Sequence, residues 1–288
     1  MAGRNAIILA AGTSSRFVPL NYERPKGLLD VKGEILVERQ IRQLKEAGID
    51  DITIVVGYMA ESFSYLRDKF GLSIVENNDY NQYNNTSSII RVLDKLDDTY
   101  ICCSDNYFSR NVFMGDPSES YYSALYAEGD TDEYCLKTDA NHYIKSVSVG
   151  GKDSWYMVGH AYFSHSFSER FSRIMENEYQ TPSTKHEYWE DVYIRHIDEL
   201  PMKMNKYGTG DIFEFDTLDE LRLFDASYIS DTRSSLLKAI CRQNGWRERE
   251  LTGFRKITAT RKSPQFTFFY GGDQYLYDAR LEEKVRKL

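Results

Sequence analysis

Cysteine is scarce in this sequence of 288 residues, and its four cysteines show no metal-binding spacing such as C-x2-C. Long apolar runs are absent as well. No stretch approaches the roughly 18 residues of a membrane span, and residues 6–11 are too few for the apolar core of a signal peptide. These absences favour reduced thiols in a cytoplasmic protein, and we expect no membrane partner.

Positive charge is in the minority, since 36 Lys and Arg face 44 Asp and Glu and the net charge is −8. An acidic chain is poorly suited to bind nucleic acid or an anionic membrane broadly, so no nucleic-acid partner is expected. Any anionic ligand must instead be met by local cations.

The first hundred residues alternate between strand and helix patterns. Apolar or β-branched runs predict strands at 6–9, 52–56, 73–76 and 100–103, and apolar residues at helical spacing predict helices between them. This order predicts an α/β fold with a parallel sheet covered by helices.

The rest of the sequence is richer in strand patterns. Strands are predicted at 121–127, 134–137, 143–149, 156–163 and 211–216, and helices around 167–175, 189–197 and 218–223. A linker-like composition near 227–234 precedes a helix and a β-rich tail at 254–277. We therefore expect two domains, residues 1–228 and 229–288, of which the second is a small helix-plus-β-hairpin appendage.

The loop after the first predicted strand carries two cations, Arg16 and Lys26. Open α/β sheets bind ligands beyond the carboxyl ends of their strands, and a loop of small residues brings backbone N–H groups close to an anion. Arg16 and Lys26 would supply charge for phosphates, and Pro25 stiffens the approach of Lys26. Neither G-x-x-x-x-G-K-[ST] nor G-x-G-x-x-G occurs in this loop. A solvated loop with two surface cations is the competing interpretation.

Three carboxylates could bind a metal ion. Asp105 directly follows the strand at 100–103, and the strand period of two places Glu214 and Asp216 on one face. Mg2+ prefers a few carboxylates together with phosphate oxygens and water. The alternative is a turn residue at Asp105 and a solvated strand edge at Glu214 and Asp216.

Several stretches resemble a known family. Leu9–Gly12, Ser15–Phe17, Pro19 and Pro25-Lys26 resemble the signature of the nucleotidyltransferases that activate sugar phosphates. Further positions are similar to the bacterial choline-phosphate cytidylyltransferases: Val55–Tyr58, Asn77–Tyr80, Tyr83–Asn85, Ser104–Tyr107 and Glu187–Glu190. The resemblance covers about residues 5–225. It implies the Rossmann-like nucleotide-diphospho-sugar transferase fold, with a mixed, mostly parallel sheet.

The resemblance also implies an activity, namely Mg2+-dependent transfer of CMP from CTP to a small phosphorylated or phosphonylated amine, with release of pyrophosphate. It implies Arg16 on the β- and γ-phosphates, Lys26 on the α-phosphate and the attacking oxygen, and Asp105, Asp216 and Glu214 on Mg2+. The nucleotide would be bound by the backbone of Leu9, Ala10, Ala11 and Gly12, together with Asn85 and Ser87 or Ser88.

The acceptor of this family carries an ammonium group, which aromatic faces and nearby carboxylates bind well. Candidate residues are Tyr188, Trp189, Glu187, Glu190, Tyr134 and Tyr162. The competing interpretation is an amphipathic helix whose Trp189 and Tyr193 pack into the core. Where the family has a Trp near position 134, this chain has Tyr134, so 2-aminoethylphosphonate and phosphoethanolamine stand beside phosphocholine as candidate acceptors.

Two other functions stay open, a sugar-1-phosphate nucleotidyltransferase and a non-catalytic nucleotide-binding relative. The expected partners are CTP and the acceptor, with a homodimer as one option. The tail at 229–288 vaguely resembles the first strands of choline and aminoglycoside kinases. Because no catalytic lobe follows it, we expect no kinase activity.

Overall fold

The computed structural model describes residues 3–257 and 261–288, which form two compact units. The first unit contains the chain up to Gly12 and Val37–Glu214, and the second contains Thr13–Leu36 and Phe215–Leu288. The second unit thus combines an early loop with the end of the chain. The predicted domain boundary after residue 228 rests on the linker-like composition near 227–234, and it stays a prediction.

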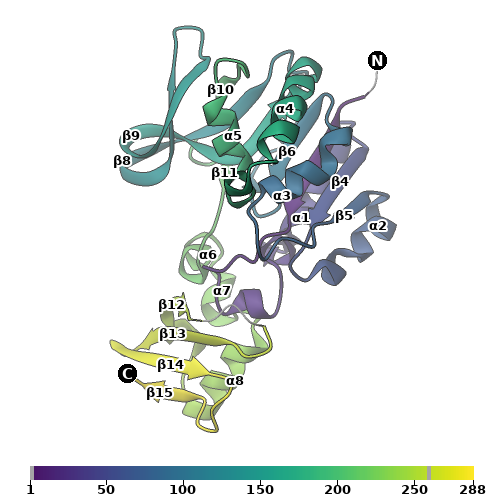
Figure 1. Ribbon diagram of the computed structural model, residues 1–288. Helices are drawn as coiled ribbons and strands as arrows, with labels where there is room; N and C mark the ends of the chain where they lie inside the picture. Colours follow the sequence, from purple (N-terminus) through teal and green to yellow (C-terminus); the bar gives the residue numbers. More distant parts are fainter. Residues whose placement is uncertain (1–2, 258–260) are drawn as a thin grey trace. The chain divides into compact units, whose positions relative to one another are not determined.

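A seven-stranded mixed sheet forms the centre of the first unit (Figure 1). The strand order is β10-β8-β9-β6-β1-β4-β5. Strands β1 (Asn5–Ala10), β4 (Asp51–Val56), β5 (Ser73–Glu76) and β6 (Thr99–Cys103) are parallel to one another. β9 (Ile144–Phe163) runs antiparallel to both β6 and β8 (Tyr121–Thr138), and β10 (Lys203–Lys206) is parallel to β8. This confirms the predicted fold class.

Helices of this unit form where apolar residues recur every three or four positions. In α1 (Leu36–Glu46), Val37, Ile41 and Leu44 are all fully buried, and Gly48 ends the helical region with a positive φ of 76°. Helices α2 (Tyr65–Phe70) and α3 (Thr86–Ile89) precede β5 and β6. Helices α4 (His165–Glu178) and α5 (Trp189–Arg195) follow β9 and share one apolar core with the sheet.

Two strand predictions need correction. The segments predicted as four strands between 121 and 163 form only two long ones, β8 and β9, because irregularities in their register absorb the residues that looked like breaks. Gly129 and Gly150 adopt positive φ there. The strand predicted at 211–216 is also wrong, since β11 contains only Ile212–Phe213 and pairs with β7 (Tyr107–Phe108).

The second unit is built on a four-stranded antiparallel sheet, larger than the predicted hairpin. Its order is β12 (Thr252–Lys256), β13 (Gln265–Tyr270), β14 (Asp273–Asp278) and β15 (Val285–Lys287). Phe254, Phe266 and Phe268 are buried in it. The early segment contributes two short 3-10 turns, Leu20–Tyr22 and Lys26–Leu28, and the hairpin β2 (Asp30–Val31) and β3 (Glu34–Ile35).

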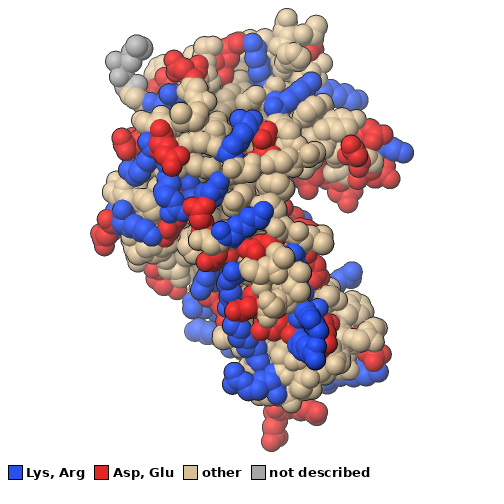
Figure 2. Space-filling model, turned by 180° about the vertical axis from the view of Figure 1, so that it is seen from behind, with Lys and Arg blue, Asp and Glu red and all other residues tan. Residues whose placement is uncertain are grey.

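Helices of the second unit are short. They are α6 (Leu218–Phe224), α7 (Ser227–Ser230) and α8 (Ser235–Asn244), and the last of these ends at Gly245 with a φ of 72°. Within the described ranges, no helix has the length and apolar character needed to cross a membrane. Basic and acidic side chains are interspersed over the face of the molecule in Figure 2. This mixture agrees with the expectation, from the net charge of −8, that the chain has no broad basic surface for anions.

Candidate active site

The carboxyl ends of the parallel strands meet at one edge of the sheet in the first unit. Hydrogen bonds join the loops that leave this edge: Tyr58 N–H donates to the Ala11 carbonyl at 3.0 Å, and Ser104 N–H donates to the Leu9 carbonyl at 3.0 Å. Gly12 is exposed, and a Cβ atom built on it would meet no atom within 4 Å. The backbone of the predicted nucleotide-binding segment therefore ends in open space at this edge.

Asp105 lies in the turn that follows β6 and is half-buried. The turn is fixed from α1, because Gln40 Nε2 donates to the carbonyls of Cys103 and Asn106, each at 2.8 Å. Gln40 is itself buried. Nothing in its sequence context marks this residue, since it looks like any polar position on a helix.

Asp105 and Glu214 both influence the thiol of Cys103. Burial raises the pKa of Cys103 well above its ordinary value, and the negative charges of Asp105 and Glu214 raise it further. The structure thus brings these two predicted ligands to the same part of the first unit. Over the described residues, no group of three or more His, Cys, Asp or Glu side chains could hold a metal ion. One or two carboxylates nevertheless fit Mg2+, which takes its other ligands from phosphates and water.

The expected common strand face of Glu214 and Asp216 does not exist. β11 ends at Phe213, and the next residues lead into α6. Asp216 N–H donates to Glu220 Oε2 at 2.7 Å, and the Thr217 side chain caps the helix. Glu214 and Asp216 therefore lie in the segment that leads into α6. Strand β11 has only two residues and is too short to orient both carboxylates.

Arg16 and Lys26 converge on one carboxylate in the second unit. Asp216 Oδ1 lies 2.9 Å from Arg16 Nη2 and 3.6 Å from Lys26 Nζ. The Arg16 side chain is 72% exposed, whereas that of Lys26 is only 5% exposed. Both cations belong to residues 13–29, which we call the cation loop. The competing interpretation, a solvated loop with two surface cations, is thereby excluded for Lys26.

Ser87 and Ser88 use their side chains inside the protein. Asn77 Nδ2 donates to Ser87 Oγ at 2.8 Å and to Ser88 Oγ at 3.0 Å, and all three residues are buried. Arg91 Nε in turn donates to Asn77 Oδ1 at 3.1 Å. These serines hold the loop after β5 in place, and their predicted contact with the nucleotide stays a prediction.

Asn85 lies against α5, beside residues predicted for the acceptor. Its Oδ1 accepts the N–H of Trp189 at 2.7 Å, and its Nδ2 lies 3.4 Å from Glu190 Oε2. Tyr122 donates its hydroxyl to Glu190 Oε1 at 2.9 Å. Burial raises the pKa of Glu190 to about 7. Tyr122 was not predicted, because nothing distinguishes it from its neighbours on the strand.

Tyr134 and Tyr188 come together near a second carboxylate, Asp191. Their ring centroids are 6.5 Å apart in an edge-to-face arrangement, and Tyr134 donates its hydroxyl to Asp191 Oδ1 at 2.9 Å. Burial and this hydrogen bond raise the pKa of Tyr134. Tyr188 is 46% exposed. Glu187 is held in an ion pair with Arg195 at 2.8 Å.

The side chains of Trp189 and Tyr162 are not part of the group that Tyr134, Tyr188 and Asp191 form. Trp189 is 2% exposed and stacks on Tyr122 in the core, with ring centroids 5.7 Å apart. Tyr193 is also buried there, as the core interpretation of this helix expects. Tyr162 pairs with Tyr100 near the amino end of β6, and its hydroxyl donates to Asp98 Oδ1 at 3.0 Å. The structure therefore does not bring Tyr162 to the carboxyl edge.

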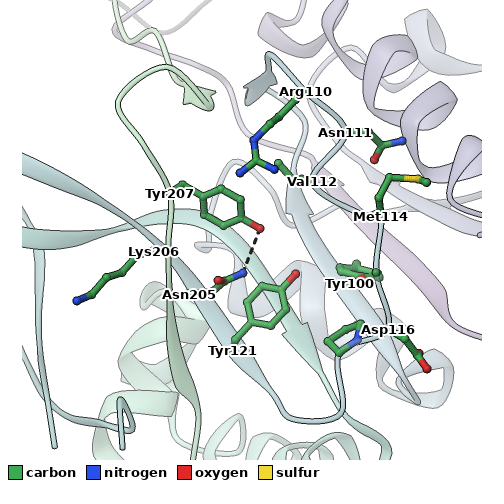
Figure 3. A pocket seen from close by; sticks show the side chains of 12 residues that line it. Tyr100, Arg110, Asn111, Val112, Met114, Asp116, Tyr121, Asn205, Lys206 and Tyr207 are labelled. Carbon is green, nitrogen blue, oxygen red and sulfur yellow. Dashed lines mark hydrogen bonds between the residues drawn. The ribbon is translucent and has the colours of Figure 1, made fainter. Parts of the chain in front are cut away.

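A cavity of about 390 Å3 opens in the first unit between Tyr100, Tyr121 and Tyr207 (Figure 3). Asn205 Nδ2 donates to the Tyr207 hydroxyl at 3.1 Å. Arg110 points toward Tyr207 and is held by Asp211 through two hydrogen bonds of 2.8 and 3.0 Å. No predicted site residue lines this cavity.

Known proteins match the chain over most of its length. A model of the MobA-like NTP transferase domain matches residues 6–111. The 2-aminoethylphosphonate cytidylyltransferase of Lancefieldella rimae is 36% identical over 234 residues, which are 80% of this chain and 95% of that protein. The choline-phosphate cytidylyltransferase of Streptococcus pneumoniae is 33% identical over 217 residues, 75% of this chain and 95% of that protein.

A solved structure supports the same relationship. The structure of CTP:phosphocholine cytidylyltransferase from Streptococcus pneumoniae superposes with a TM-score of 0.75 and 32% sequence identity. The match covers 78% of this chain and 98% of that one.

Proposed function

Because this chain belongs to the nucleotidyltransferase family that includes choline-phosphate and 2-aminoethylphosphonate cytidylyltransferases, we propose that it transfers CMP from CTP to a small phosphorylated or phosphonylated amine. The observation that carries the proposal is the convergence of exposed Arg16 and buried Lys26 on one carboxylate. Two cations fixed in this way can also bind a phosphate chain.

The proposed chemistry is an in-line displacement at phosphorus. An anionic oxygen of the acceptor attacks the α-phosphorus of CTP, the bond to the bridging oxygen of the β-phosphate breaks, and pyrophosphate leaves. Because the attacking oxygen is already ionised, no general base is required, and catalysis consists of positioning and charge neutralisation. Lys26 neutralises the α-phosphate and Arg16 the leaving pyrophosphate, while the backbone of Leu9–Gly12 binds the nucleotide.

Mg2+ is part of this proposal, with Asp105, Asp216 and Glu214 as its protein ligands. When bound, the ion neutralises charge on the phosphates of CTP. The fit rests on the donor chemistry, since carboxylates are hard oxygen ligands. Asp105 is presented by a turn that Gln40 fixes, which suits a ligand that must keep its position.

The acceptor ammonium would be bound by Tyr188, Tyr134 and Glu190. Tyr188 offers an exposed aromatic face, and Glu190 offers a carboxylate whose charge an ammonium would stabilise. Phosphocholine fits this class. A primary amine such as 2-aminoethylphosphonate or phosphoethanolamine is the second candidate, because Glu190 and Asp191 can accept hydrogen bonds that a quaternary ammonium cannot donate.

A pyrophosphate-release assay tests the function. CTP, UTP, ATP and GTP are each combined with phosphocholine, phosphoethanolamine, 2-aminoethylphosphonate and glucose-1-phosphate in the presence of Mg2+. We expect release with CTP and a phosphoamine or phosphonate. Release only with the sugar phosphate would favour a sugar nucleotidyltransferase, and no release with any pair would favour a non-catalytic relative.

We also propose a cytoplasmic enzyme, because all four cysteines are unpaired. A homodimer stays a prediction that sedimentation would test.

A further inference from the structure

We propose that the C-terminal extension, residues 229–288, positions the cation loop, and that Glu23 is the residue through which it does so. This inference rests on the proposed function, since it assigns Arg16 and Lys26 of that loop to the phosphates of CTP. It gives the extension a role in the transfer reaction through its contacts to the cation loop.

Glu23 binds the amino-terminal end of α8 with both carboxylate oxygens. Oε1 accepts the Ser234 hydroxyl and the Leu236 N–H, the latter at 3.1 Å. Oε2 accepts the Ser235 hydroxyl and the Ser235 N–H, the latter at 2.9 Å. The first N–H groups of a helix have no partner inside the helix, and a carboxylate there also interacts favourably with the helix dipole. One side chain of the cation loop therefore makes four hydrogen bonds to residues more than 200 positions away.

Two neighbouring contacts extend this attachment. The Tyr22 hydroxyl donates to the Gln265 carbonyl at 3.1 Å, and its ring lies 6.3 Å from that of Phe266. Tyr22 and Phe266 are buried, so Tyr22 anchors the cation loop in the core of the second unit.

Glu23 is well placed to control Lys26. It lies between the two 3-10 turns of the loop, Leu20–Tyr22 and Lys26–Leu28, three residues before the lysine. A shift of the loop at Glu23 would therefore move Lys26, and misplacement of a catalytic group by about 1 Å can cost about 100-fold in rate.

The matches to relatives leave part of this chain uncovered. The two curated relatives are each covered to 95%, but the matches take up only 80% and 75% of this chain. Since the family resemblance in the sequence covers about residues 5–225, we expect the unmatched part in the extension.

The test compares Glu23→Ala with Asp273→Asn. The control removes an ion pair of 2.5 Å between Asp273 and Lys287, which lies in the same extension and does not involve the cation loop. For Glu23→Ala we expect kcat to fall about 10-fold or more and KM for CTP to rise, with little change in KM for the acceptor. Partial unfolding would lower the active fraction but would leave both KM values unchanged, so the rise in KM for CTP identifies positioning.

Hydrogen exchange measured by mass spectrometry gives a readout that does not need activity. We expect faster exchange in peptides covering 13–29 and 235–240 of Glu23→Ala, and wild-type exchange in the control. If the wild type transfers no CMP, the proposed function fails while this readout still reports on the attachment. If Glu23→Ala does not fold, Ser235→Ala, which removes one hydroxyl donor, takes its place. Unchanged exchange, or faster exchange with wild-type kcat and KM, would overturn the inference.

Discussion

Replacing Lys26 with methionine tests the most specific residue assignment. Methionine keeps most of the volume of the buried side chain and removes only the charge. Asp216 would retain its ion pair with Arg16 at 2.9 Å, so the local structure has a reason to persist. We expect the variant to fold, with a loss of stability of about 1 kcal/mol, which is usual for a single substitution.

The size of the catalytic effect follows from the geometry. At 3.6 Å, the Coulomb attraction between the Lys26 ammonium and the carboxylate oxygen is about 4.6 kcal/mol at an effective dielectric constant of about 20. The attraction to a phosphate oxygen at a similar distance would be similar. Loss of a fixed donor to a developing charge typically costs about 2.7–4 kcal/mol, or about 10²–10³ in kcat. We therefore expect kcat for pyrophosphate release to fall by about 10²–10³ in Lys26→Met.

The matched control is Arg24→Met, which removes an exposed cation two residues away in the same loop. Its kcat should change by less than about twofold, because exposed charges contribute little. Thermal unfolding and circular dichroism of both variants would establish that they are folded. A folded Lys26→Met enzyme with a near-wild-type kcat would refute the assignment of Lys26 to the α-phosphate.

Three further predictions concern the other site residues. The pKa of Glu190 is raised to about 7, so its carboxyl group is neutral below that pH and ionised above it. We therefore expect kcat/KM for the acceptor to rise through pH 7. The ratio of this value in the wild type to that in Glu190→Gln should rise in the same range, because ionisation of the acceptor cancels in the ratio. A flat ratio would remove Glu190 from the acceptor site. Asp105→Asn should raise the Mg2+ concentration needed for half-maximal rate about tenfold or more, measured by Mg2+ titration, and an unchanged requirement would count against ligation. Tyr188→Ala should raise KM for the acceptor without loss of stability. Trp189→Ala should lower the free energy of unfolding in denaturant by about 3–5 kcal/mol, because it empties part of the core. A destabilised Tyr188→Ala together with a stable Trp189→Ala that has a raised KM would contradict both placements.

The fold of the first unit was predictable because its signals are local. Buried residues at 37, 41 and 44 mark one helix face, and glycines mark where helices end. The breaks expected within β8 and β9 were wrong because the bulged ribbon accommodates Gly129 and Gly150 at positive φ. Local pattern cannot distinguish a turn from a bulge when the pairing partner is unknown.

The family motif names Lys26 and Asp105 as candidate site residues, and their roles stay predictions. The contacts that hold them in the fold carry no such local signal. The ion pairs of Asp216 with Arg16 and Lys26 join residues about 200 positions apart, and the hydrogen bonds of Glu23 to α8 join residues even further apart. Gln40 and Tyr122 carry no distinguishing pattern, because their roles arise from where β6 places Cys103 and where α5 places Glu190.

Identification of the reaction product tests the central claim most directly. The wild-type enzyme is incubated with CTP, MgCl2 and either 2-aminoethylphosphonate or phosphocholine, and the mixture is analysed by 31P NMR and mass spectrometry. We predict a CMP ester of the acceptor, formed in equal amount with pyrophosphate. Unchanged CTP with every phosphoamine and phosphonate, at protein concentrations where the fold is verified, would contradict the account.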